Sequence, residues 1–122
     1  MTHYNKSGRY DDAIELGQEW LKQYPDDVFH ASTIYEQLGM TYLSKAIKDT
    51  AHKDEWIRQA VAYFDKDLSI HQKTDGDIEL YLVGRGFESA GHYSTANSCI
   101  YYGRAIKSFE VSANIFRGKA ST

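Results

Sequence analysis

Apolar residues recur at intervals of three and four along almost the whole chain, which is the spacing of amphipathic helices. The first such segment covers residues 10–23 and ends before Pro25, because proline breaks helices. A second segment begins after Asp27, whose carboxylate is suited to cap a helix, and fades near Asp49. The apolar positions of these two segments are Tyr10, Ala13, Ile14, Gly17, Trp20, Leu21, Ala31, Ile34, Tyr35, Leu38, Tyr42 and Ala46.

The same spacing continues in the second half and predicts helices over about residues 54–71, 77–90 and 94–107. Asp75 or Asp77 is the expected cap after the break at 73–77, and Gly91 is expected to adopt the left-handed conformation in a tight turn at 90–93. Further apolar positions continue to the C-terminal region, as an extension of the fifth helix or as a separate one: Ile106, Phe109 or Ala113, and Phe116. Strand-type alternation is absent and the chain has one proline, so the fold class is all-α.

Composition and charge limit the number of domains, the partners and the cellular location that can be expected for this chain. The 122 residues suit one domain, and a net charge of −3 with 25% charged residues gives no basic field for nucleic acid or an anionic membrane. The single cysteine, Cys99, cannot form an internal disulfide, which agrees with a reducing compartment. No apolar run reaches the length of a membrane span, and the first residues do not resemble a signal peptide. We therefore expect a cytoplasmic protein without nucleic-acid or membrane partners.

One stretch has a recognisable pattern of large, small and aromatic positions. It reads Leu80-x-x-Val83-Gly84-x-x-Phe87, then Gly91-x-Tyr93-x-x-Ala96-x-x-x-Ile100. This pattern resembles the tetratricopeptide repeat, in which two antiparallel helices approach through small residues. Leu80 replaces the tryptophan that is usual in the repeat, and Ile100 replaces the second aromatic.

Two further units match the repeat incompletely. The first matches only the second helix of the pattern, through Gly8, Tyr10, Ala13, Trp20, Leu21 and Pro25. The second matches through Tyr35, Leu38, Gly39, Tyr42, Ala60 and Phe64. Gly39 and Ala60 are 21 residues apart, whereas Gly84 and Ala96 are 12 apart, so an insertion of 21 − 12 = 9 residues is expected near 45–53.

The resemblance implies antiparallel helix hairpins stacked as a short right-handed α-solenoid. It divides the single domain into a half repeat at 1–26, repeats at 27–73 and 74–107, and a capping helix or extension at 108–120. The residues expected at close packing positions are Gly8, Tyr10, Ala13, Gly39, Tyr42, Ala60, Phe64, Gly84, Phe87 and Ala96. Enlarging one of them, as in Ala96→Leu, is expected to destabilise the fold by roughly 1–3 kcal/mol through overpacking.

Members of this family bind segments of other proteins in a concave groove lined by the first helix of each hairpin. The resemblance therefore implies a protein- or peptide-binding scaffold. Helical spacing places the groove face at Thr33, Glu36 or Gln37, Met40 and Ser44, and at Tyr81, Arg85 and Glu88. The alternative for these residues is an ordinary solvated helix face. A clamp for a terminal carboxylate is not expected, because Thr33, Gln37, Ile78 and Leu82 stand where its charged residues would be.

Catalytic or metal chemistry finds no support in the sequence. The five histidines, His3, His30, His52, His71 and His92, show no helical zinc-site spacing and are expected to be solvated or capping. Cys99 is expected to be a small buried residue within a helix. Gly84-Arg85-Gly86 follows no strand, so it lacks the context of a phosphate-binding loop. We expect no enzymatic activity, metal or cofactor.

Two other interpretations remain open. The helix at 10–23 lacks the first helix of its repeat, so its uncovered side favours self-association into a homo-oligomer. The incomplete first repeat also favours a fragment of a larger sensor or enzyme, in which the groove responds to a signalling peptide.

Overall fold

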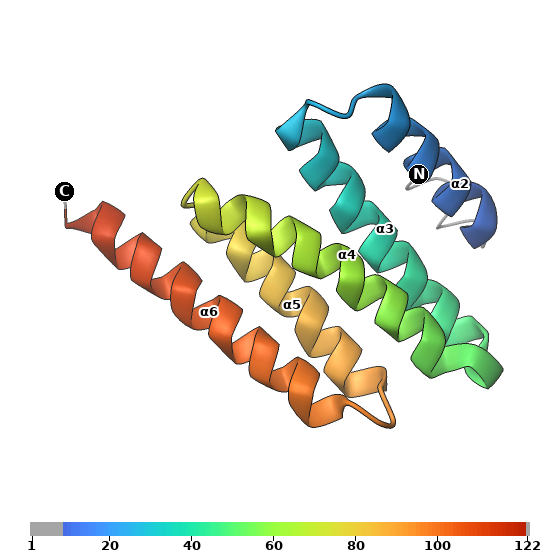
Figure 1. Ribbon diagram of the computed structural model, residues 1–122. Helices are drawn as coiled ribbons and strands as arrows, with labels where there is room; N and C mark the ends of the chain where they lie inside the picture. The colour runs from blue at the N-terminus through green and yellow to red at the C-terminus, as the bar shows by residue number, and fades with distance from the viewer. Residues whose placement is uncertain (1–8, 122) are drawn as a thin grey trace.

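The computed structural model describes residues 9–121, which form a row of helices that succeed one another from α2 to α6 (Figure 1). The helices are α2 (Tyr10–Gln23), α3 (Val28–Lys48), α4 (Lys53–Lys73), α5 (Asp77–Tyr93) and α6 (Ser98–Ala120), with a short 3-10 turn, η1 (Thr50–His52), before α4. Strands are absent from the described residues, so the all-α class is confirmed. Their arrangement as tetratricopeptide-type repeats stays a prediction.

The beginning of the chain follows its local signals closely. Helix α2 has the predicted bounds, and the Asp27 carboxylate accepts the backbone N–H of His30 at 3.0 Å, as expected of a helix cap. Helix α3 ends at Lys48, next to Asp49, and η1 completes the segment in which the insertion was placed. Gly8 lies outside the described residues.

The connection between α4 and α5 differs from its prediction. Neither Asp75 nor Asp77 caps α5; the N-cap position is Gly76, and no side chain caps the helix. Asp75 instead adopts a left-handed backbone conformation, with φ of 53°, which aspartate tolerates better than most residues. The Gly76 N–H then donates to the carbonyl of His71 at 3.0 Å, so the turn closes on the end of α4.

The predicted turn at 90–93 is also wrong, because α5 continues to Tyr93 and the break lies at 94–97. Gly91 is a buried helical residue, and a Cβ there would lie 3.0 Å from the Tyr102 ring of α6. Gly91 therefore permits a close approach of α6 and does not form a turn. Ala96 lies in the loop and is exposed, so it is not a packing residue.

Helix α6 runs without a break to Ala120, so the C-terminal apolar positions extend the fifth helix. Its buried face differs from the predicted one: Ile106 and Phe116 are exposed, whereas Tyr101, Ala105, Ser108 and Ser112 are buried. Small residues on this face let α6 approach α5 closely. The Ser112 hydroxyl donates to the backbone carbonyl of Asp77 at 2.6 Å, which satisfies it within the contact.

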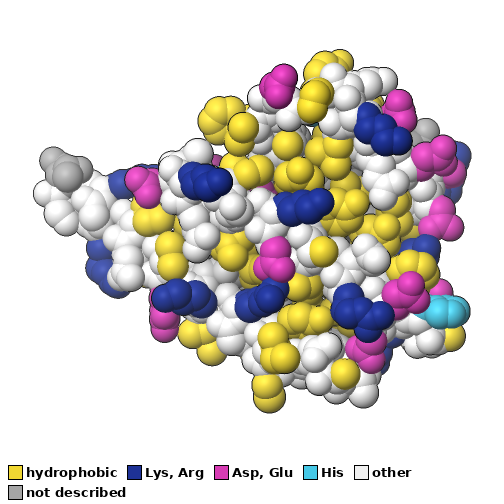
Figure 2. Space-filling model, viewed as in Figure 1, with side chains coloured by type: hydrophobic (Ala, Val, Ile, Leu, Met, Phe, Trp, Pro, Cys, Tyr) yellow, Lys and Arg dark blue, Asp and Glu magenta, His cyan; other side chains and the backbone are white. Residues whose placement is uncertain are grey.

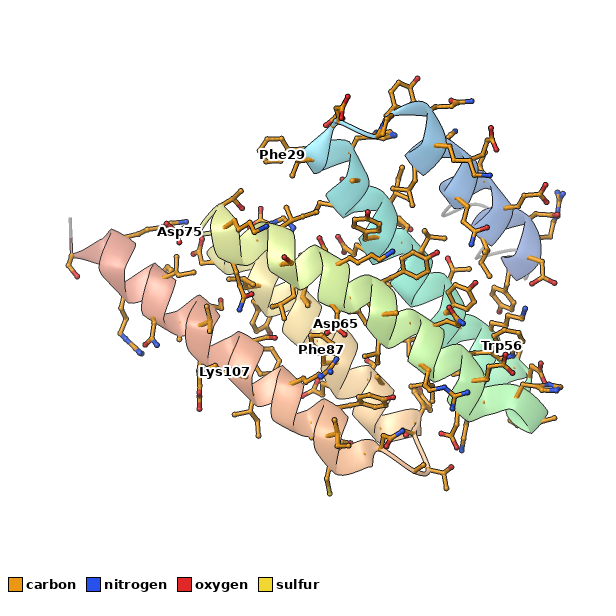
Figure 3. All side chains as sticks on the ribbon, in the orientation of Figure 1. Phe29, Trp56, Asp65, Asp75, Phe87 and Lys107 are labelled. Carbon is orange, nitrogen blue, oxygen red and sulfur yellow. The ribbon has the colours of Figure 1, made fainter. Side chains whose placement is uncertain are left out.

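Phe64 of α4 is the central residue of the core. It is 1% exposed, and its ring centroid lies 5.9 Å from that of Phe87. Phe87 is labelled on α5 in Figure 3. A Cβ on Gly39 of α3 would lie 2.5 Å from the Phe64 ring, and one on Gly86 of α5 would lie 2.8 Å from it. Phe64 therefore fills the space between α3 and α5. The other predicted packing residues that are buried are Ala13, Tyr42, Ala60 and Gly84, while Tyr10 is half-buried.

Candidate functional site

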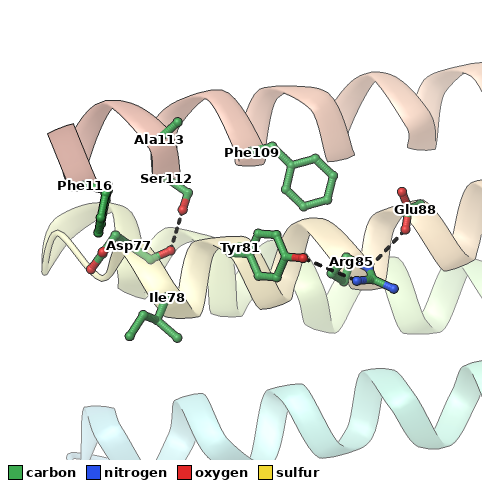
Figure 4. A pocket seen from close by; sticks show the side chains of 9 residues that line it. All are labelled: Asp77, Ile78, Tyr81, Arg85, Glu88, Phe109, Ser112, Ala113 and Phe116. Carbon is green, nitrogen blue, oxygen red and sulfur yellow. Dashed lines mark hydrogen bonds and ion pairs between the residues drawn. The ribbon is translucent and has the colours of Figure 1, made fainter.

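A groove of about 610 Å³ lies between α5 and α6 (Figure 4). It is lined by Asp77, Ile78, Tyr81, Arg85, Glu88, Phe109, Ser112, Ala113 and Phe116. The Phe109 ring reaches over α5 because Gly84 has no side chain there; a Cβ on Gly84 would lie 2.6 Å from the ring. Tyr81 and Phe109 then lie 5.4 Å apart between ring centroids, and they form an aromatic wall.

Polar groups occupy both ends of this groove. At one end the Arg85 guanidinium contacts the Glu88 carboxylate at 3.1 Å and donates to the Tyr81 hydroxyl at 3.4 Å (Figure 4). The hydrogen bond with Tyr81, together with these neighbouring charges, raises the pKa of Arg85. At the other end Asp77 pairs with Lys119 at 2.7 Å, and this hydrogen bond lowers the pKa of the Asp77 carboxyl. A ligand would thus meet an apolar centre and charged ends.

A second, smaller hollow of about 270 Å³ lies between α3 and α5. Its lining residues are Glu36, Met40, Phe64, Leu82, Val83, Arg85, Gly86 and Ser89. Phe64 reaches this hollow from α4 because Gly39 and Gly86 leave room for its ring. Arg85 lines both this hollow and the α5–α6 groove, so the two are neighbours on one face.

A buried cluster of Ser32, Asp67 and His71 joins α3 to α4 near the smaller hollow. The Ser32 hydroxyl donates to Asp67 Oδ1 at 2.7 Å and lies 2.6 Å from His71 Nε2, which is itself 3.0 Å from Asp67 Oδ1. All three side chains are almost inaccessible to solvent. Burial raises the pKa of Asp67, and burial followed by the charge of Asp67 raises the pKa of Glu36.

This cluster contains the residue types of a serine hydrolase but not their geometry. In a catalytic triad the serine and the carboxylate contact different nitrogens of the imidazole ring. Here both contact His71 Nε2, and the Ser32 hydroxyl is buried. We interpret the cluster as a polar link between helices. Within residues 9–121, no group of three or more His, Cys, Asp or Glu side chains could hold a metal ion.

The predicted groove residues fall into three sets. Tyr81, Arg85 and Glu88 line the α5–α6 groove, and Glu36 and Met40 line the smaller hollow, which Arg85 also borders. The remaining predicted residues, Thr33, Gln37 and Ser44, line neither.

Sequence reasoning missed the walls that α6 contributes, Phe109, Ala113 and Phe116. The available signal for these walls in the sequence was the row of apolar positions near the C-terminus.

The solvent exposure of two side chains, His71 and Cys99, differs from what the sequence predicted. His71 is buried and not solvated, and Asp67 one turn earlier and Ser32 on α3 both contact its Nε2 atom; the i, i+4 spacing of Asp67 and His71 was the available signal. Cys99 is exposed and not buried, because it lies at the start of α6 on the side away from Tyr101.

Comparisons with protein-family models, with curated proteins and with solved structures find no match to this chain. In the part of the chain that the structure describes, no helix is long and apolar enough to cross a membrane. The face of the molecule shown in Figure 2 carries side chains of both charge signs among hydrophobic ones. Self-association, origin from a larger regulatory protein and cytoplasmic location stay predictions of the sequence.

Proposed function

We propose that this chain is a protein- or peptide-binding module that uses the face formed by the α5–α6 groove and the neighbouring α3–α5 hollow. The observation that carries the proposal is the exposed apolar lining of the groove. Ile78 is 68% exposed, Phe116 61% and Tyr81 47%, although they lie around one depression. Exposed apolar patches that are rimmed by polar groups typically mark interaction sites.

The composition of the groove favours a protein segment as its occupant. Tyrosine and arginine are enriched where proteins bind one another, because they combine a large contact area with hydrogen-bonding ends. Tyr81 and Arg85 supply these properties here, and the apolar wall of Phe109 gives an anchor for a large side chain. The resemblance of the helix pattern to tetratricopeptide repeats supports the same class of ligand.

The proposal is tested by a pull-down from lysate of the source cells. Wild-type domain is compared with Tyr81→Ala/Phe116→Ala, which removes two exposed groove side chains. Ile106→Ala is the matched control, because Ile106 is an exposed apolar residue of α6 outside the groove. Circular dichroism verifies that all variants are folded.

The expected result is a partner that wild type and the control retain and the double variant loses. Equal recovery by all three, or no specific partner, would contradict the proposal.

A further inference from the structure

Glu36 of α3 is a half-buried carboxylate without a direct partner. It forms no hydrogen bond or ion pair with any residue that the structure describes. Its surroundings are mainly unfavourable to negative charge: burial raises its pKa most, the charges of Asp67 and Glu79 raise it further, and His71 opposes them. The charged form of a carboxylate in such a place is stabilised by a cation placed beside it.

The hollow around Glu36 has apolar walls. Met40 and Leu82 flank it with exposed side chains, and Phe64 lies beneath. Arg85, the cation of the lining, is engaged by Tyr81 and Glu88 and forms no ion pair with Glu36. The space therefore combines apolar contact with one available negative charge. Lysine and arginine side chains have the complementary form, a methylene stem that ends in a cation.

We propose that the α3–α5 hollow receives a lysine or arginine side chain of the bound peptide, whose cationic group pairs with Glu36 while its stem contacts Met40 and Leu82. The inference rests on the proposed function, because it names a chemical feature of the same ligand. The α5–α6 groove takes the large apolar residue of that ligand. Since Arg85 borders both sites, the ligand is a segment with a basic residue close to a large apolar one.

The first experiment is selection from a displayed library of random twelve-residue peptides. Wild type, Glu36→Gln and a control, Ser89→Ala, which changes a neutral residue of the same hollow, are used as baits after circular dichroism shows that each is folded. We expect wild type and Ser89→Ala to enrich lysine or arginine beside an apolar residue. Glu36→Gln is expected to enrich the apolar residue alone.

The second experiment measures one selected peptide by isothermal titration, together with the same peptide in which norleucine replaces its basic residue. For a charge-assisted pair in a half-buried site, we expect norleucine to weaken wild-type binding about tenfold and to leave Glu36→Gln unaffected. Equal loss on both proteins would place the cation elsewhere and overturn the inference.

The failures of the two proposals are distinguishable. Enrichment of apolar peptides by wild type without basic residues would overturn the role of Glu36 and leave the groove intact. Failure of wild type to enrich any peptide over uncoated support would overturn both.

Discussion

The contact between Gly39 and Phe64 makes a sharp prediction about stability. In most helix interiors, replacing glycine by alanine stabilises the protein by about 1 kcal/mol, because alanine loses less backbone freedom on folding. At Gly39 the new methyl group would lie 2.5 Å from the Phe64 ring. Phe64 is 1% exposed and Gly86 bounds its ring on α5, so the ring must shift before the methyl group can fit.

The magnitude follows from these opposing effects. Overpacking a well-filled core costs about 1–3 kcal/mol. Subtracting the helix gain leaves Gly39→Ala between neutral and about 2 kcal/mol less stable than wild type. Gly103 is the matched control, because it lies within α6, in its second turn, and a Cβ there would meet nothing within 4 Å. Gly103→Ala should keep the whole gain of about 1 kcal/mol.

The assay is urea unfolding followed by circular dichroism, with wild type, both single variants, Phe64→Leu and Gly39→Ala/Phe64→Leu. The smaller leucine should relieve the clash, so that Gly39→Ala costs less or becomes stabilising in the Phe64→Leu background. This coupling is the direct signature of the contact. If Gly39→Ala stabilises wild type as much as Gly103→Ala does, the packing of Phe64 between α3 and α5 is refuted.

Three further predictions concern other parts of the fold. Ser32→Ala removes the hydroxyl that donates to Asp67, and it should lower the free energy of unfolding in urea by about 1–3 kcal/mol, because Asp67 and His71 stay buried with fewer partners. Thr33→Ala, at an exposed position of the same helix, is the control, and a similar loss in both variants would contradict a special role for Ser32. Ala96→Leu should change stability by less than about 0.5 kcal/mol, because Ala96 is exposed in a loop; a loss above 1 kcal/mol would restore the packing role first expected for it. Folding raises the pKa of Glu36, so the contribution of this group to stability is fully present below its ordinary pKa of 4.5 and is lost as the pH rises through the higher folded value. Unfolding measured from pH 4.5 to neutrality should therefore show a flatter pH dependence for Glu36→Gln than for wild type, and parallel curves would refute the shift.

The helix class and the first helix boundaries were predictable because their signals are local. The apolar period needs only neighbouring residues, and Asp27 caps α3 with its own side chain. The turn at Gly91 was not predictable in this way, since a helix-ending glycine and a helix-packing glycine look alike in sequence. Contact with Tyr102 on the next helix decides between them.

The buried face of α6 was misjudged for a related reason. The pattern follows large apolar residues, and it therefore selected Ile106 and Phe116. Where two helices approach closely, small residues such as Ser108 and Ser112 occupy the contact and the large ones remain outside. Hydrophobicity alone misleads at such a contact, because steric fit determines which residues can be buried.

The candidate site was predictable on the side of α5 and much less so elsewhere. Tyr81, Arg85 and Glu88 share a helix face through their spacing, which the sequence gives directly. The opposite wall depends on how α6 crosses α5, and the link from Ser32 to Asp67 spans 35 residues. Neither relation has a period along the chain, so both require the tertiary structure.

Glycine residues connect the packing of this fold to its candidate site. Gly84 admits the Phe109 ring over α5, which builds the aromatic wall of the larger groove. Gly39 and Gly86 admit Phe64 between α3 and α5, which gives the smaller hollow its apolar base. The α5–α6 groove and the α3–α5 hollow thus owe their aromatic walls to glycines, because a Cβ at these positions would clash with the rings. The same steric requirement that orders the helices therefore also shapes the surface at which we propose that a ligand binds.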